Sequence, residues 1–87
     1  MKIKEVAKTK TPLGFVEILY KTARRYYRIV RTMKGNMYSI YVNNSEYGDP
    51  QYDEPMVYSK RTVREYTIYE CKESIEVYEM LEDLGKL

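Results

Sequence analysis

The residues of this sequence that are most able to do chemistry are acids and tyrosines gathered in a loop between positions 43 and 55. The acids are Glu46, Asp49, Asp53 and Glu54, and no base lies between positions 43 and 59. Paired carboxylates can act in acid–base catalysis, and alternating oxygen ligands can bind calcium. Counting from Asp49 puts Glu54 at the sixth position, where a calcium loop requires glycine. Exposed acids without an apolar wall are poor acid–base catalysts. We therefore expect neither a metal site nor a catalytic site here.

The rest of the composition excludes the common catalytic and metal-binding arrangements. The sequence has no histidine and a single cysteine, Cys71. Ser–His and Cys–His catalytic pairs, histidine metal sites and zinc sites built on cysteine pairs are all excluded. Cys71 has no partner for an internal disulfide, and we expect a buried thiol. The sequence thus predicts a non-enzymatic protein without a cofactor.

The acidic loop also contains a short repeat. Tyr47-Gly48-Asp49-Pro50 is followed by Tyr52-Asp53-Glu54-Pro55, so that each copy is a tyrosine, an acidic stretch and a proline. Such a loop is either simply solvated or a recognition loop that addresses a basic partner. On the second hypothesis the contact residues are Tyr47, Asp49, Tyr52 and Asp53.

Charge is divided unevenly along the chain. Residues 1–36 hold ten Lys/Arg against two Asp/Glu, a net charge of +8, whereas residues 37–87 hold five against eleven, a net charge of −6. Two halves that neutralise each other would give this pattern, and so would a two-sided molecule. Because acids recur along the C-terminal helical segment and bases along residues 21–34, we favour a molecule that is acidic over the helix and basic on the sheet.

The elements that must position these groups follow from the hydrophobic periodicity. Alternation with period two predicts strands near residues 2–5, 15–20, 24–32, 37–43, 56–58 and 63–71. Lys34-Gly35-Asn36 is the clearest hairpin turn. Helical spacing begins at Ile75, with Ser74 as the expected N-cap and Gly85 as the residue after the C-cap.

These elements predict an α+β fold in one domain spanning residues 1–87. A small antiparallel meander of five or six strands occupies about residues 2–71, and one amphipathic helix over about residues 74–85 packs on one of its faces. The expected helix-facing set is Val16, Ile18, Tyr20, Tyr27, Ile29, Tyr38, Ile40, Val42, Tyr66 and Ile68. One helix covers one face, so the other face must meet solvent, a partner or another part of the protein.

That opposite face is predicted to combine aromatic and basic side chains. Phe15, Glu17, Leu19, Val30, Ser39 and Thr67 would accompany five candidate anchors, which are Arg24, Tyr26, Arg28, Tyr41 and Tyr69. Three hypotheses compete for this face. It is a second core or a homodimer interface, a protein-binding surface in which Tyr and Arg are the hot spots, or a platform for single-stranded nucleic acid.

We favour a small interaction protein that binds, and inhibits or regulates, a protein partner through the Tyr/Arg face and the acidic loop. The alternative is a single-stranded nucleic-acid-binding protein that uses the basic N-terminal half, and a third hypothesis is a homodimeric structural domain. No stretch is long and apolar enough for a membrane span, and no signal sequence precedes the first strand. We expect a cytoplasmic protein, of a size typical of phage, bacterial or archaeal regulators.

Overall fold

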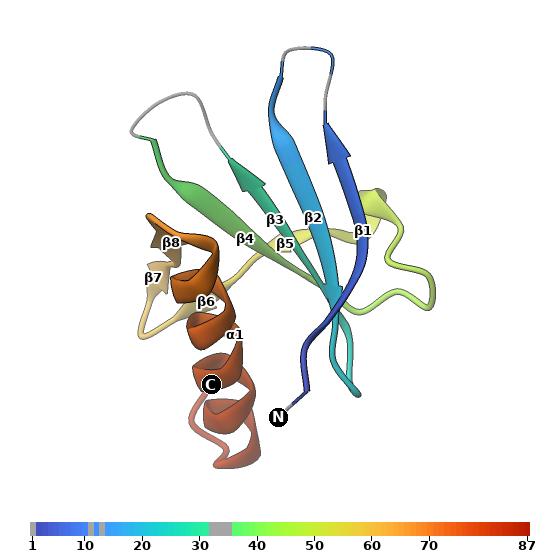
Figure 1. Cartoon of the computed structure of the whole chain (residues 1–87). Coiled ribbons are helices and arrows are strands. Elements are labelled where there is room, and N and C mark those ends of the chain that lie inside the picture. The colour runs from blue at the N-terminus through green and yellow to red at the C-terminus, as the bar shows by residue number, and fades with distance from the viewer. Residues whose placement is uncertain (1, 11, 13, 32–35) are drawn as a thin grey trace.

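Four long strands follow one another as an antiparallel meander, as Figure 1 shows. The computed structural model describes the chain except for residues 1, 11, 13 and 32–35. The strands are β1 (Lys4–Lys10), β2 (Val16–Lys21), β3 (Tyr26–Arg31) and β4 (Tyr38–Asn43). This order confirms the predicted α+β meander. Of the predicted hairpin turn, Lys34 and Gly35 lie outside the described residues, and Asn36 has a φ of +53°.

Short elements connect the meander to the helix. They are the 3₁₀ turn η1 (Pro50–Tyr52) and the strands β5 (Glu54–Pro55), β6 (Val57–Tyr58), β7 (Arg61–Thr62) and β8 (Arg64–Glu65). Both β5 and β8 pair with β4, which completes a six-stranded sheet, and β6 pairs with β7 in a separate hairpin. The far edge of β4 is therefore occupied along much of its length, whereas β1 lies at the opposite edge of the sheet.

The core lies between the sheet and the helix α1 (Ile68–Asp83). Period-two alternation places one residue in two of each long strand on this face, where a branched or aromatic side chain packs well. The buried apolar residues are Ile18, Tyr20, Tyr27, Ile29, Ile40, Val42, Met56, Val63, Cys71 and Ile75. The prediction for the helix-facing residues of β2, β3 and β4 is thus confirmed, with Val16 and Tyr38 partly buried at its margin.

The helix begins six residues earlier than predicted, and of the strand predicted over residues 63–71 only Arg64–Glu65 (β8) is extended and paired. Thr67 is the N-cap, and its hydroxyl oxygen accepts a hydrogen bond from the Glu70 backbone N–H at 3.1 Å. The Thr67 hydroxyl also donates to the Glu70 carboxylate at 2.9 Å. This Thr-x-x-Glu pattern is a helix-start signature, and it outweighs the short alternation around Tyr66. Ser74, the expected N-cap, is buried within the helix and donates to Glu65 at 2.9 Å.

The predicted end of the helix is confirmed. Gly85 follows the C-cap residue Leu84 and has a φ of +67°, a conformation that glycine adopts without steric cost. The Gly85 N–H donates to the Glu82 carbonyl and the Lys86 N–H to the Leu81 carbonyl, the paired bonds of a Schellman motif. No helix in the described part of the chain is long and apolar enough to span a bilayer.

Candidate functional site

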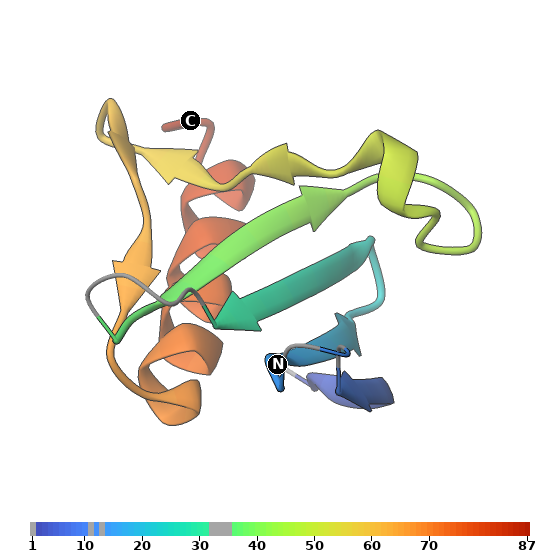
Figure 2. The ribbon, with the colours of Figure 1, turned by 90° about the horizontal axis from the view of Figure 1, so that it is seen from above.

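The loop after β4 folds back onto the sheet face opposite the helix. Figure 2 shows α1 on one side of the molecule and η1 on the other, with the strands between them. Gly48 is buried at the contact, and a Cβ atom built on it would lie 3.1 Å from the Tyr26 ring and 3.3 Å from Leu19. Only glycine allows the backbone to approach this closely, with a φ of +69°. The protein's own loop therefore covers the part of the expected open face around Leu19, Tyr26 and Arg28.

An ion pair between β3 and the loop fixes this arrangement. Arg28 Nη1 donates to both oxygens of the Asp53 carboxylate at 2.6 Å, and Arg28 Nη2 donates to the Gly48 carbonyl at 2.7 Å. The side chains of Arg28 and Asp53 are only 11% and 16% exposed. Asn43 Nδ2 completes the network with bonds of 2.7 Å to Asp53 Oδ1 and to the Asp49 carbonyl. Most of the polar groups that the loop buries are satisfied in this way.

The structure brings together residues that the sequence assigned to two separate surfaces. Tyr26, Arg28 and Tyr41 were expected to be free anchors on the sheet, and Asp53 a free contact on the loop. They form one packed unit instead, in which Tyr41 is half-buried between its register partners Arg28 and Pro55. Their free exposure is therefore a wrong prediction.

Two further predicted anchors lie away from this face. Arg24 belongs to the turn between β2 and β3, and its guanidinium forms ion pairs with Glu82 and Asp83 at the end of the helix. Tyr69 lies in the first turn of α1, where it is largely exposed. Both predictions are wrong in position, because Arg24 precedes β3 and the chain is helical rather than extended at Tyr69.

The ion pairs also correct the prediction of a two-sided charge distribution. Among the described residues, every ion pair joins an arginine of the basic N-terminal part to an acid of the C-terminal part. Arg25 binds Glu82, and this hydrogen bond holds the pKa of the Glu82 carboxyl below its usual value. The two halves thus neutralise each other in part, through the arginines and not through the lysines.

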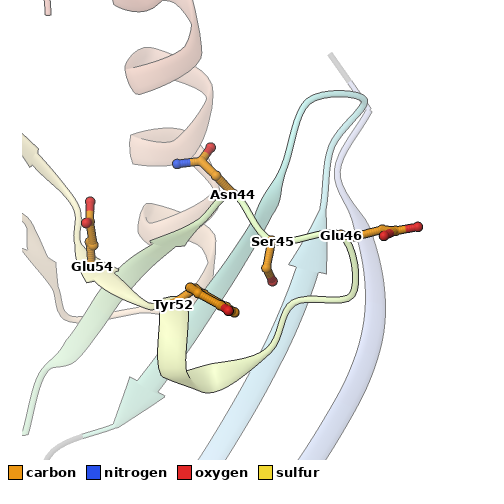
Figure 3. Close-up of a pocket in the computed structure, with 5 residues that line it drawn as sticks. All are labelled: Asn44, Ser45, Glu46, Tyr52 and Glu54. Atoms are coloured by element: carbon orange, nitrogen blue, oxygen red, sulfur yellow. The ribbon is translucent and has the colours of Figure 1, made fainter.

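The loop also forms a hollow of about 470 Å³. It is lined by Asn44, Ser45, Glu46, Tyr52 and Glu54. Figure 3 shows Glu46 and Glu54 at opposite ends of this group, with Ser45 and Tyr52 between them. We call it the loop pocket. Tyr52 was predicted as a contact residue, whereas the other four lining residues were not.

Hydrogen bonds between side chains and the backbone fix the conformation of the loop that forms the pocket. The Asn43 side-chain oxygen accepts a bond from the Ser45 N–H at 2.9 Å, and the Ser45 hydroxyl accepts one from the Asp49 N–H at 2.8 Å. The Asp49 carboxylate caps η1 by accepting from the Gln51 N–H at 3.2 Å. The predicted contact Asp49 is therefore partly structural, while Tyr47, at 79% exposed, is free to contact a partner.

A second hollow, of about 450 Å³, lies where the chain start, the β2–β3 turn and the helix meet. Its lining comprises Lys2, Lys4, Lys21, Thr22, Ala23, Arg24 and Glu79. Glu79 is 4% exposed, and its Oε2 atom accepts bonds from the Thr22 hydroxyl at 2.5 Å and the Tyr27 hydroxyl at 2.7 Å. Burial and this carboxylate raise the pKa of the Tyr27 hydroxyl. Glu79 follows Ile75 by four residues, and this helical spacing was the available signal in the sequence that Glu79 faces the core.

The lining of the loop pocket indicates which ligand chemistry it suits. The pocket combines two carboxylates, an aromatic ring and neutral polar groups, and no base lies in its sequence segment. An aromatic face with flanking carboxylates suits a cation.

Comparison with protein-family models, with curated proteins and with solved structures finds no match for this chain.

Proposed function

We propose that this chain is a non-enzymatic interaction protein whose loop pocket holds a lysine or arginine side chain of a protein partner. The observation that carries the proposal is that two carboxylates, Glu46 and Glu54, line one hollow together with the Tyr52 ring. The aliphatic stem of the incoming side chain would lie along the Tyr52 ring, and its charge would reach a carboxylate. Binding of such a partner through its basic segment would inhibit or regulate that partner.

Preorganisation favours the loop over other acidic surfaces of the molecule. The Arg28–Asp53 ion pair and the buried Gly48 hold the loop in place before any partner arrives. A partner therefore loses little affinity to ordering the loop, which is a major cost when flexible segments bind. Glu73 and Glu76 on the outer side of α1 are exposed and line neither of the two hollows described above.

The alternative role, single-stranded nucleic-acid binding, has a smaller surface available than the sequence indicated. The stacking platform would have used Tyr26, which lies against Gly48, Tyr41, which is half-buried, and Arg28, which is paired with Asp53. The described bases without an ion pair are spread over several elements, among them Lys8 and Lys10 on β1, Arg61 on β7 and Lys72 on α1. We therefore prefer the protein partner.

A peptide-binding assay tests the proposed function. Capped peptides with one central arginine or lysine would be compared with the same peptides carrying citrulline or acetyl-lysine. One exposed ion pair and one cation–π contact contribute about 0.5–1 kcal/mol each, so that Tyr52→Ala or Glu54→Gln should weaken binding about two- to fivefold. Glu76→Gln on the helix removes the same charge and is the matched control. Equal weakening by Glu54→Gln and Glu76→Gln would show non-specific attraction and contradict the proposal.

A further inference from the structure

The strand β1 is the long open edge of the described sheet. It pairs with β2 alone, and all seven of its residues are exposed. The backbone N–H and C=O groups on its outer side therefore face solvent. Such an edge is a template on which an extended peptide can add as a further strand. In Figure 1 the upper end of β1 also extends past the helix, which leaves that end accessible.

The charge along this edge is strongly positive and is not neutralised within the molecule. Lys4, Lys8 and Lys10 lie on β1 against one acid, Glu5, and none of these lysines has an ion pair in the described structure. Lys4 is also the register partner of Lys21, and like charges directly opposite each other destabilise a sheet. An anionic ligand would relieve this repulsion. Arg24, Arg25 and Arg28, by contrast, already have acidic partners.

The same features discourage a second copy of the chain from adding at this edge. Two β1 strands side by side would bring lysines against lysines. The pairing with β2 also shifts register between Glu5 and Ala7, and such a bulge twists an edge away from simple pairing. Lysines and a bulge are the usual means by which proteins prevent edge-to-edge association. The exposed edge of β1 therefore disfavours pairing with a basic strand and favours pairing with an acidic one.

The register of β1 defines the pattern that an added strand needs. Lys8 and Lys10 lie opposite Ile18 and Val16, so both point to the helix side of the sheet. Residues opposite them on an added strand are also two apart and share that face. The complementary sequence therefore carries acids at alternate positions, separated by residues that favour extended backbone.

We propose that β1 binds an acidic extended segment of a protein as an added strand, with carboxylates at alternate positions opposite Lys8 and Lys10. This surface is separate from the loop pocket, and the proposal does not depend on the function proposed for that pocket. Main-chain hydrogen bonds supply the pairing, and the lysines select the acidic sequence.

The test uses a fluorescein-labelled peptide of sequence TEVEVT and fluorescence anisotropy at about 50 mM salt, near which charge effects are only partly screened. Three comparison ligands separate the sources of affinity. They are TQVQVT, which lacks the charges, TEVEVT with its alternate strand-pairing amides N-methylated, and a single-stranded oligothymidylate of similar charge. The protein variants are Lys8→Glu with Lys10→Glu, and Lys60→Glu with Lys86→Glu as a charge-matched control away from β1.

The proposal expects TEVEVT to bind and both the neutral and the N-methylated peptides to bind at least about tenfold more weakly. Lys8→Glu/Lys10→Glu should lose a similar factor, while Lys60→Glu/Lys86→Glu stays within about twofold. The proposal is overturned by equal binding of the N-methylated peptide, by no peptide binding, or by a preference for the oligothymidylate. A dimer in light scattering that Lys8→Glu/Lys10→Glu dissociates would also overturn it, because the edge would then belong to a second copy.

Discussion

Replacing Arg28 with alanine is expected to destabilise the fold far more than replacing an exposed arginine. Arg28 makes three hydrogen bonds of 2.6–2.7 Å to Asp53 and Gly48, and little of either charged side chain is exposed. Removing one partner of a buried ion pair costs about 3–5 kcal/mol, because the other charge stays buried without compensation. Here the loop can separate from the sheet and let Asp53 rehydrate, so we expect about 2–3 kcal/mol.

That loss is a large part of the total stability. A domain of 87 residues is expected to have a free energy of unfolding of about 4–13 kcal/mol. In a domain of this size each kcal/mol lowers Tm by about 4–8 °C, so Arg28→Ala should lower Tm by about 10–20 °C. Urea unfolding followed by far-ultraviolet circular dichroism gives the free energy directly. If Arg28 were instead a free anchor on an open face, as expected from the sequence, the variant would fold normally.

Arg24→Ala is the matched control for this experiment. It removes the same side chain from an ion pair in which Arg24 is 39% and Asp83 56% exposed. Such surface pairs contribute below about 1 kcal/mol. A double-mutant cycle of Arg28→Ala and Asp53→Ala completes the test. The free energy of unfolding should show a coupling of more than about 1 kcal/mol between the two residues. Equal small losses for Arg28→Ala and Arg24→Ala would refute the docked loop.

Three further predictions concern other parts of the fold. Gly48→Ala should cost about 1 kcal/mol more than Gly85→Ala, because both sites have positive φ but only Gly48 lies against a side chain; thermal unfolding of the two variants measures this difference. Burial raises the pKa of the Cys71 thiol to about 12, so alkylation near pH 8 should proceed only through unfolding, and rapid labelling of the native protein would contradict the buried site. The pKa of Glu82 is lowered in the folded protein, so this group contributes stability above its ordinary pKa, and the contribution is lost as the pH falls through the folded pKa. Glu82→Gln should therefore make the free energy of unfolding depend less on pH in the acid range. An unchanged pH dependence would argue against the Arg25 contact.

The sheet and its core could be predicted because their signal is local and repeated. In β2, β3 and β4 each alternate residue is apolar, and a register error would have exposed an entire face. The helix start could not be predicted from periodicity alone, because Tyr66, Thr67 and Ile68 alternate as a strand does. The capping pattern at Thr67 and Glu70 was the deciding signal, and it competed with that alternation.

The covered sheet face was the main feature that the sequence did not predict. Its key contact joins Arg28 to Asp53, residues 25 positions apart in elements of different type, and no periodicity links them. Gly48 is part of the sequence repeat, but nothing in the sequence around it indicates that it packs against Tyr26. The loop pocket depends on this docking, so its lining could not be assigned before the fold was known.

Mapping a basic peptide onto the protein by nuclear magnetic resonance tests the proposed function most directly. An arginine-containing capped peptide would be titrated into ¹⁵N-labelled protein, with the citrulline peptide as the control. The loop pocket predicts amide shift changes confined to residues 44–54, the largest at Ser45 and Tyr52, and none with citrulline. Shifts on α1 or β1 with an unchanged loop, or identical shifts with both peptides, would contradict it.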